Sequence, residues 1–210
     1  MVRRPTLRYI LGGNDTAEDS AWILTWTKKR FYFARPEDYT FSVAEIAYVL
    51  AQEPRWGGHV DAHMSVAWHS ILVANAVFDE LWDGDDTAID LARSVARAAL
   101  LHDASEAFLR DIPAPLKRMP EMAGYRAVEK RVQGAIVKAF DLDVVASTYG
   151  QIIKHHDELV TERERAELRP DADWGRPYGR MSKTWIAPPS LAVIHENRFL
   201  EAWAHYGGEG

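Results

Sequence analysis

Four side chains of types that bind divalent metals interrupt the apolar stripes of three predicted helices: His69, His102, Asp103 and Asp157. An ionised carboxylate buried without a partner costs several kcal/mol, so inward-facing acids indicate a cation or a hydrogen-bonded network. One such residue is more often an ordinary core histidine, cap or solvated acid. Four on three helices favour a metal site, because helical bundles build such sites from facing side chains. Two imidazoles and two carboxylates suit Zn, Mn, Fe, Co or Ni, with open positions for water and substrate.

The elements that must position these residues follow from apolar periodicity and capping signals. Ser42, with Glu45 three residues later, has the form of a capping box, so a helix is expected to start there and to end at Pro54. Thr87 is expected to cap another helix, whose stripe continues through His102. The period of the apolar residues predicts further helices at about these ranges: 64–81, 87–106, 125–140 and 144–168.

The two ends of the chain carry different signals. The segment through Asp38 is predicted to be irregular, with a short hairpin around residues 27–30. Residues 169–189 are rich in Pro, Gly, Asp and Arg and are expected to form a surface loop. Ser190 is expected to cap a last helix, whose inner face is predicted to hold Leu191, Ile194, Phe199 and Ala202. With no alternating strand pattern, repeat or linker, the sequence predicts one all-α domain over residues 1–210.

Composition narrows the class of protein. The chain has 210 residues, 47% of them hydrophobic and 27% charged, with a net charge of −6, so it has no broad basic surface for a nucleic-acid backbone. It has no cysteine, which excludes disulfides, thiolate catalysis and cysteine-held metals and leaves His, Asp and Glu as ligands. No apolar run reaches the roughly 18 residues of a membrane span, and the first residues lack the apolar centre of a secretory signal. We expect a cytoplasmic protein that binds neither a nucleic-acid duplex nor a membrane.

Several motifs resemble those of one enzyme family. They are SVAWHSILVAN around His69, ALLHDASEAFLRDIPAPLK over residues 99–117, IIKHHDELVTERERAEL around Asp157, and the pair Arg55-Trp56 ahead of the first motif. Together they resemble the HD-domain metal-dependent phosphohydrolases, in particular the YfbR-like 5′-deoxynucleotidase group and the related phage dATP triphosphohydrolases. The resemblance implies a single HD-type helical bundle, with its site motifs within residues 55–168.

The resemblance also implies roles for individual residues. His69, His102, Asp103 and Asp157 are expected to bind a catalytic divalent metal, which is Zn, Co, Mn, Fe or Mg. Glu106 is expected to orient or deprotonate the attacking water, and Asp111 to lie on the far side of the phosphate, although Asp111 is nearly as well explained as a turn cap before Pro113. Expected substrate-binding residues are the phosphate clamp Arg55, the cations Lys117 and Lys154, and Trp56, which is expected to disfavour a ribose 2′-hydroxyl.

The expected reaction is hydrolysis of the 5′-phosphate ester of a deoxyribonucleotide, and we favour a deoxynucleoside monophosphate as the substrate. One alternative is a dATP-type triphosphohydrolase that releases triphosphate, and another is an inactive HD module that binds nucleotides in a regulatory role. A two-iron oxygenase needs further histidine ligands, and no histidine lies between His102 and His155. His155 and His156 adjoin Asp157 but are expected to lie outside the ligand set. Relatives self-associate, so a homo-oligomer is expected.

Overall fold

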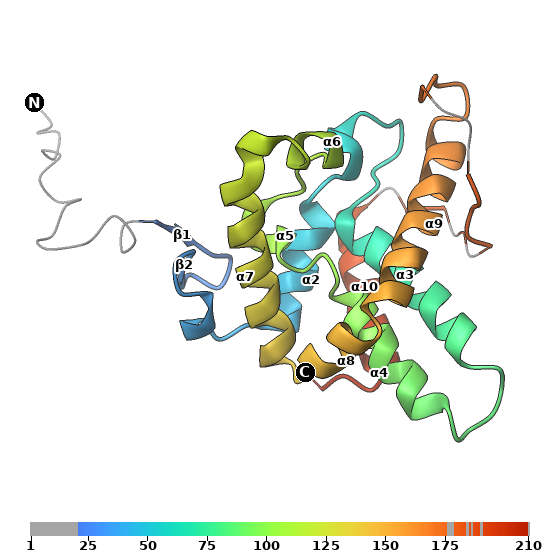
Figure 1. Ribbon diagram of the computed structural model, residues 1–210, viewed down its shortest axis with the longest axis horizontal. Helices are drawn as coiled ribbons and strands as arrows, with labels where there is room; N and C mark the ends of the chain where they lie inside the picture. Colours follow the sequence, from blue (N-terminus) through green and yellow to red (C-terminus); the bar gives the residue numbers. More distant parts are fainter. Residues whose placement is uncertain (1–20, 176–178, 184, 186, 190, 210) are drawn as a thin grey trace, which may run out of the picture.

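The first described element is a hairpin that precedes the helices. The computed structural model describes residues 21–175, 179–183, 185, 187–189 and 191–209. Strands β1 (Trp22–Leu24) and β2 (Arg30–Tyr32) pair in antiparallel register, which confirms the hairpin predicted around residues 27–30. Lys28 adopts a positive φ of 61° in its turn. Figure 1 shows this hairpin beside the helical body of the chain.

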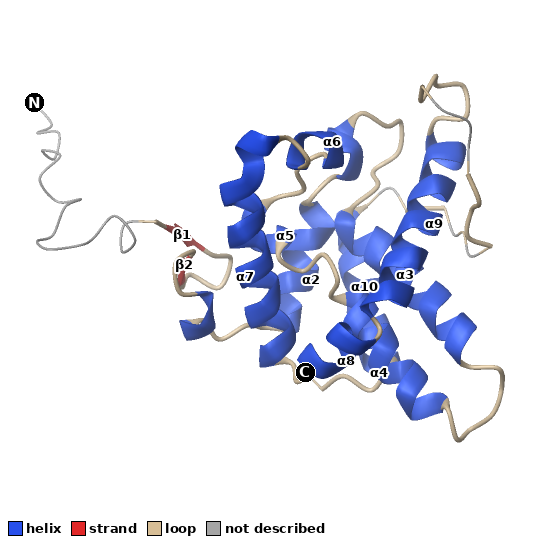
Figure 2. Cartoon of the chain, viewed as in Figure 1, coloured by secondary structure: helices blue, strands red, loops and turns tan. Residues whose placement is uncertain are grey.

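All the other regular secondary structure of the described residues is helical, so the predicted all-α class is confirmed (Figure 2). The longer helices pack around α3 (Val66–Leu81), which contacts four of them, and almost every residue of α3 through Phe78 is buried. Ser65 caps α3 by accepting a hydrogen bond from the backbone N–H of Trp68. The four partners of α3 are α2 (Val43–Gln52), α4 (Ile89–Leu100), α9 (Gly150–Leu168) and α10 (Ala192–His205). Within the described residues, no helix is both long and apolar enough to cross a membrane.

Shorter helices connect these elements. Helix α7 (Ala123–Ala139) is the long exception and corresponds to the helix predicted at 125–140. The short elements are the 3₁₀ helices η2 (Pro36–Asp38), η3 (Arg55–Gly58) and η4 (Pro120–Met122), and the helices α5 (Glu106–Leu109), α6 (Ala114–Lys117) and α8 (Asp143–Thr148). The predicted helix 144–168 is therefore two helices, α8 and α9, separated at Tyr149. The described residues of 169–189 form neither helix nor strand, as predicted.

The predicted helix 87–106 is wrong in its second half. Helix α4 ends at Leu100, and residues 101–105 form turns before α5 begins. The side chain of Gln133 on α7 stabilises this break, because it accepts a hydrogen bond from the N–H of Ser105 at 3.0 Å and donates one to the carbonyl of Leu101 at 2.7 Å. Thr87 does not cap α4, which begins after Ala88 without a side-chain cap.

Two further local predictions need correction. Helix α2 begins after Ser42 as predicted, but no capping box forms, because Glu45 instead accepts hydrogen bonds from Thr27 and from the hydroxyl of Tyr39. Helix α2 ends at Gln52, two residues before Pro54. Through its hydrogen bonds with Thr27, the buried carboxylate of Glu45 ties the hairpin to the helical bundle.

The last helix turns a different face inward than predicted. Its buried residues are His195, Phe199 and Trp203, which lie four residues apart on one stripe, whereas Leu191 is 58% exposed and Ile194 is also exposed. Phe199 was placed correctly. The buried ring of His195 has polar partners for both nitrogens, with Nδ1 2.6 Å from Oγ of Ser65 and Nε2 2.8 Å from the carbonyl oxygen of Pro189. The predicted cap Ser190 lies outside the described residues.

Candidate metal centre

Three of the predicted ligands, from separate segments, converge inside the bundle. His69 lies on α3, His102 lies in the turn after α4, and Asp157 lies on α9. One ligand atom from each residue lies within 4.8 Å of the other two. The Nε2 atom of His69 is 3.2 Å from Oδ1 of Asp157, and the Nε2 atom of His102 is 4.0 Å from the same oxygen. The three side chains can therefore share one ion.

Both imidazoles are oriented through their other nitrogen. Nδ1 of His69 lies 2.5 Å from Oε1 of Glu164, and Nδ1 of His102 lies 2.8 Å from the carbonyl oxygen of Ala99. Both partners are acceptors, so each Nδ1 donates and each Nε2 is left to face the centre. Neither Nε2 has a hydrogen-bond partner, although both are buried. An imidazole held at Nδ1 with Nε2 free is the usual state of a metal-binding histidine, so these residues fit a divalent cation.

Charge at the centre also suits a cation. Burial raises the pKa of Asp157, but His69 and His102 outweigh it and hold the pKa well below its usual range, so the carboxylate stays ionised. Burial lowers the pKa of His102, but Asp103 and Asp157 outweigh it and raise the pKa to about 9. A cation at Nε2 of His102 would compete with the proton that Asp103 and Asp157 favour on this ring.

Asp103 lies beside this group but is not one of the three convergent residues. Its Oδ2 is 3.2 Å from Nε2 of His102 and 3.8 Å from a guanidinium nitrogen of Arg55. Burial raises the pKa of Asp103, and His102 outweighs it and lowers the pKa well below its usual range. Asp103 is thus an ionised carboxylate in contact with one convergent residue, and its role as a fourth ligand remains a prediction.

Glu164 is the residue that the sequence analysis missed. It lies on α9, is fully buried, and its two oxygens contact the side chains of His69, Arg55 and Trp56. A signal was present, because Glu164 follows Asp157 by two helical turns and follows the buried Val160 by four residues. The criterion that selected Asp157, a charged residue within an apolar stripe, also selects Glu164.

Glu106 is the first residue of α5 and is buried close to one basic and two acidic side chains. Its Oε1 accepts a hydrogen bond from Nζ of Lys117 at 2.9 Å, while its Oε2 has no partner. Burial, together with Asp103 and Asp111, raises the pKa of Glu106 to about 9, and Lys117 opposes that rise. The same ammonium group donates to Glu129 at 2.7 Å, so Lys117 is held between two carboxylates.

Asp111 follows Arg110, and Glu53 accepts hydrogen bonds from both residues. Arg110 has a positive φ of 76°, which is uncommon for a residue with a side chain. Its guanidinium donates to Oε2 of Glu53 at 2.6 Å, and the N–H of Asp111 donates to Oε1 of Glu53 at 3.2 Å. Burial raises the pKa of Asp111, and Arg55 opposes the rise. The arrangement gives Asp111 a fixed backbone but no direct contact with the three convergent residues.

Arg55 and Trp56 belong to η3, in the chain between α2 and α3. Nε of Arg55 donates to Glu164 at 3.0 Å, and a terminal nitrogen donates to Thr161 at 3.3 Å. The indole of Trp56 donates to Glu164 at 3.2 Å, and its ring centroid is 5.2 Å from that of Trp174. Trp174 comes from the segment 169–189, so that segment lies against a predicted substrate residue.

The remaining predicted residues lie at the outer part of α9. Lys154 is 61% exposed and its Nζ donates to Oδ2 of Asp157 at 2.7 Å. His156 points elsewhere, with its Nε2 2.8 Å from a carboxylate oxygen of Glu80, and His155 is exposed. Neither of these two histidines joins the convergent group, as predicted.

Comparison with known proteins agrees with this geometry. An all-α bundle in which His69, His102 and Asp157 can share an ion is the arrangement of an HD-domain phosphohydrolase. The model of the family described as "5'-deoxynucleotidase YfbR-like" matches residues 50–173, and the chain belongs to this family. Every residue assigned a role above, Glu164 included, lies within that match.

Two curated relatives cover most of the chain. One is the uncharacterized protein YfdR of Escherichia coli, 31% identical over 151 residues, which are 72% of this chain and 74% of the relative. The other is an uncharacterized protein of Rhodobacter capsulatus, 29% identical over 171 residues, which are 76% of this chain and 80% of the relative. These matches support the family and leave the substrate to be argued from the site.

Proposed function

We propose that this protein is a metal-dependent 5′-deoxynucleotidase that hydrolyses deoxyribonucleoside 5′-monophosphates. The observation that carries the proposal is the pair of buried Nε2 atoms, on His69 and His102, that lack hydrogen-bond partners and face Oδ1 of Asp157. Arg55 and Lys117 place positive charge on the neighbouring elements, as a phosphate substrate requires. The family description supports a deoxynucleotide as the substrate.

The residues proposed to hold the cation are His69, His102 and Asp157, with Asp103 as a fourth ligand. When bound, a divalent cation supplies Lewis-acid activation of the phosphate ester and of the water nucleophile. Glu106 is proposed to act at its Oε2, the carboxylate oxygen without a partner. That oxygen takes a proton as water adds to phosphorus, the bond between phosphorus and O5′ breaks, and the proton passes to O5′ of the leaving deoxynucleoside.

The cationic side chains are proposed to hold the phosphate. Arg55 has a planar group suited to phosphoryl oxygens, and its contacts with Glu164 and Thr161 fix that group in place. Lys117 opposes the rise in the pKa of Glu106 to about 9 but does not cancel it, and the positive charge of a bound divalent cation would lower that pKa further, toward the ionised form that a base requires. The exposed Lys154 is proposed to meet the outer phosphate oxygens, and Trp56 to pack against the sugar.

A screen of metals against nucleotides tests this proposal. Purified protein is stripped with a chelator and supplied with Mn²⁺, Co²⁺, Zn²⁺, Fe²⁺ or Mg²⁺, and each form is offered deoxynucleoside and ribonucleoside mono- and triphosphates. The products are separated so that phosphate is distinguished from triphosphate. We expect phosphate and a deoxynucleoside from the monophosphates, and no product from the stripped protein.

The outcomes of the screen separate the alternatives. Release of triphosphate from a deoxynucleoside triphosphate, with no cleavage of monophosphates, assigns the chain to the triphosphohydrolase activity. Nucleotide binding without any product, under every metal tested, assigns it to a regulatory module. Either result overturns the proposed reaction.

A further inference from the structure

We propose that Glu164 is a positioning residue that links the metal centre to the loop formed by residues 53–64, so that ordering of one orders the other. The metal part of this inference stands on the contacts of His69, whereas its consequence for nucleotide binding rests on the proposed function. Glu164 contacts His69 at Nδ1, not at the convergent Nε2 atom, and its other side-chain contacts are with Arg55 and Trp56, so it is proposed to act through these three residues.

The first support is the hydrogen bonding of the Glu164 carboxylate. Oε1 faces Nδ1 of His69 at 2.5 Å, while Oε2 accepts from Nε of Arg55 at 3.0 Å and from Nε1 of Trp56 at 3.2 Å. All three partners are donors and Glu164 is fully buried, so one carboxylate satisfies a histidine of the metal centre and the two predicted substrate residues of the loop. Hydrogen bonds of this charged kind are stronger than neutral ones, and they are buried here.

The second support is that few side-chain contacts hold Trp56, although other parts of the loop have partners of their own: Nε2 of His63 lies 3.0 Å from the carbonyl oxygen of Ala51, and the carbonyl of His59 accepts a hydrogen bond from Arg169. Its ends are joined by a bridge between Pro54 and Ser65 and by a hydrogen bond from the N–H of Arg55 to the carbonyl of Met64. Trp56 has a positive φ of 60°, a conformation that side-chain-bearing residues adopt only when their surroundings impose it. Gly57 and Gly58 follow with positive φ as well, which glycine permits.

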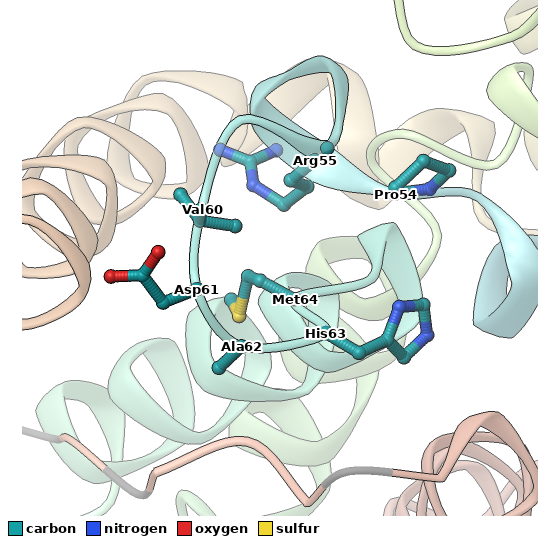
Figure 3. A pocket seen from close by; sticks show the side chains of 8 residues that line it. Pro54, Arg55, Val60, Asp61, Ala62, His63 and Met64 are labelled. Carbon is teal, nitrogen blue, oxygen red and sulfur yellow. The ribbon is translucent and has the colours of Figure 1, made fainter.

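A small open pocket lies within the loop. A cavity of about 160 Å³ lies among the side chains of the segment 54–64, and Figure 3 shows Arg55, Val60 and Met64 around it. Trp56 does not line this pocket, and the side-chain contacts of its ring in the described part of the chain are with Glu164 and Trp174. The conformation of Trp56 therefore depends on its polar anchor at Glu164 and on the ring of Trp174 beside it.

These contacts imply that metal binding at His69 and the ordering of Arg55 and Trp56 are linked. A cation at Nε2 of His69 requires that the ring be held in one orientation, and Glu164 holds that ring from the Nδ1 side. The same carboxylate then stays in place for Arg55 and Trp56. Because coupling between two sites is reciprocal, a phosphate compound that orders Arg55 and Trp56 must in turn favour metal binding.

Substitution Glu164→Gln tests the link. The amide offers one acceptor oxygen and one NH₂ group in place of two acceptor oxygens, so it satisfies either His69 or the pair Arg55 and Trp56 but not both. We expect cobalt(II) affinity, measured by absorption titration, to fall about 10- to 100-fold. We also expect faster amide hydrogen exchange in residues 55–64, measured by mass spectrometry in the metal-free protein. At least one of the two changes must occur.

The matched control is Glu167→Gln, on the same helix. It removes the same charge, but Glu167 is paired with Arg163 across one helical turn and has no contact with the metal centre. We expect its cobalt(II) affinity and loop exchange to stay within twofold of wild type. Glu164→Asp keeps the charge with a shorter reach and is expected to show an intermediate loss, which provides a second variant if the glutamine form unfolds.

The wild-type protein gives a readout that needs no substitution. Saturating cobalt(II) is expected to slow amide exchange in residues 55–64, and a 5′-methylenephosphonate analogue of a deoxynucleoside is expected to raise cobalt(II) affinity. Unchanged loop exchange on metal addition, or a Glu164 variant that matches wild type in both affinity and exchange, overturns the inference. The metal and exchange measurements contain no nucleotide, so they stand apart from a failure of the proposed 5′-deoxynucleotidase activity, which shows as absent phosphate release in the wild type.

Discussion

His69, on α3, and His102, in the turn after α4, present their Nε2 atoms to the same oxygen, Oδ1 of Asp157, at 3.2 Å and 4.0 Å. Each ring is held by a hydrogen bond at Nδ1, and neither Nε2 has one. Two rings fixed in this way lose little freedom when an ion binds. The pair therefore defines where a cation could bind.

Loss of one of these rings is expected to abolish metal retention. In His102→Ala, one of three convergent ligands is removed, and we expect cobalt(II) affinity to fall at least 100-fold with a parallel loss of activity. The measurement is metal content after dialysis together with a cobalt(II) titration. His155→Ala is the control, because that exposed imidazole lies two residues from Asp157 yet outside the group. Wild-type metal content in His102→Ala contradicts the ligand assignment.

Glu106 is expected to affect rate and not metal content. Glu106→Gln keeps the shape of the side chain and its contact with Lys117 but removes the proton acceptor at Oε2. General acid–base groups contribute about 10²- to 10⁴-fold, so we expect kcat to fall by that range while the bound cobalt(II) stays stoichiometric. Steady-state kinetics and metal analysis on the same preparation check this. A loss of less than tenfold removes Glu106 from the role of general base.

Trp56 is expected to set the preference for deoxyribose. Trp56→Ala removes the indole that lies between Glu164 and Trp174, and we expect the ratio of kcat/KM for a deoxynucleotide to that for the matching ribonucleotide to fall about tenfold or more. The control is Trp26→Ala, whose ring stacks on Tyr48 in a different part of the molecule. An unchanged ratio shows that Trp56 does not contact the sugar.

Acid is expected to destabilise the protein through His195. Burial lowers the pKa of His195, and His63 lowers it further, against the opposing effect of the Pro189 carbonyl. A histidine with a lowered pKa in the folded state binds fewer protons than the unfolded chain does, so its contribution to stability is fully present above about pH 6.5 and is lost as the pH falls below that value.

The substitution that tests this dependence is His195→Asn. The amide oxygen replaces Nδ1 as the acceptor for Ser65, and the side chain has no proton to gain. We expect the fall in melting temperature between pH 7.5 and pH 5.5 to be smaller in this variant than in wild type, as measured by thermal denaturation. His155→Asn, at an exposed position, is expected to retain the wild-type dependence. Equal slopes in all three proteins contradict the prediction.

Local sequence patterns predicted the helical class and the convergence of His69, His102 and Asp157, because a polar residue within an apolar stripe is visible in a short window. They failed where a distant residue decides the structure. Gln133, 28 residues after Ser105, ends the stripe that periodicity extends to Glu106. Thr27, 18 residues before Glu45, likewise draws Glu45 away from a capping box. Glu164 carried the right local signal, but its partners lie on other elements and give it a function only in the fold.

The contacts of Gln133 also constrain when the centre can form during synthesis. The turn that carries His102 is held by the side chain of Gln133 on α7, and Asp157 follows on α9. When His102 has been synthesised, neither Gln133 nor Asp157 has yet been added to the chain. As the polypeptide leaves the ribosome, α3 and α4 emerge before either partner. Binding of an ion by all three residues would therefore be a late event in biogenesis, because Asp157 is made only after about three quarters of the 210-residue polypeptide.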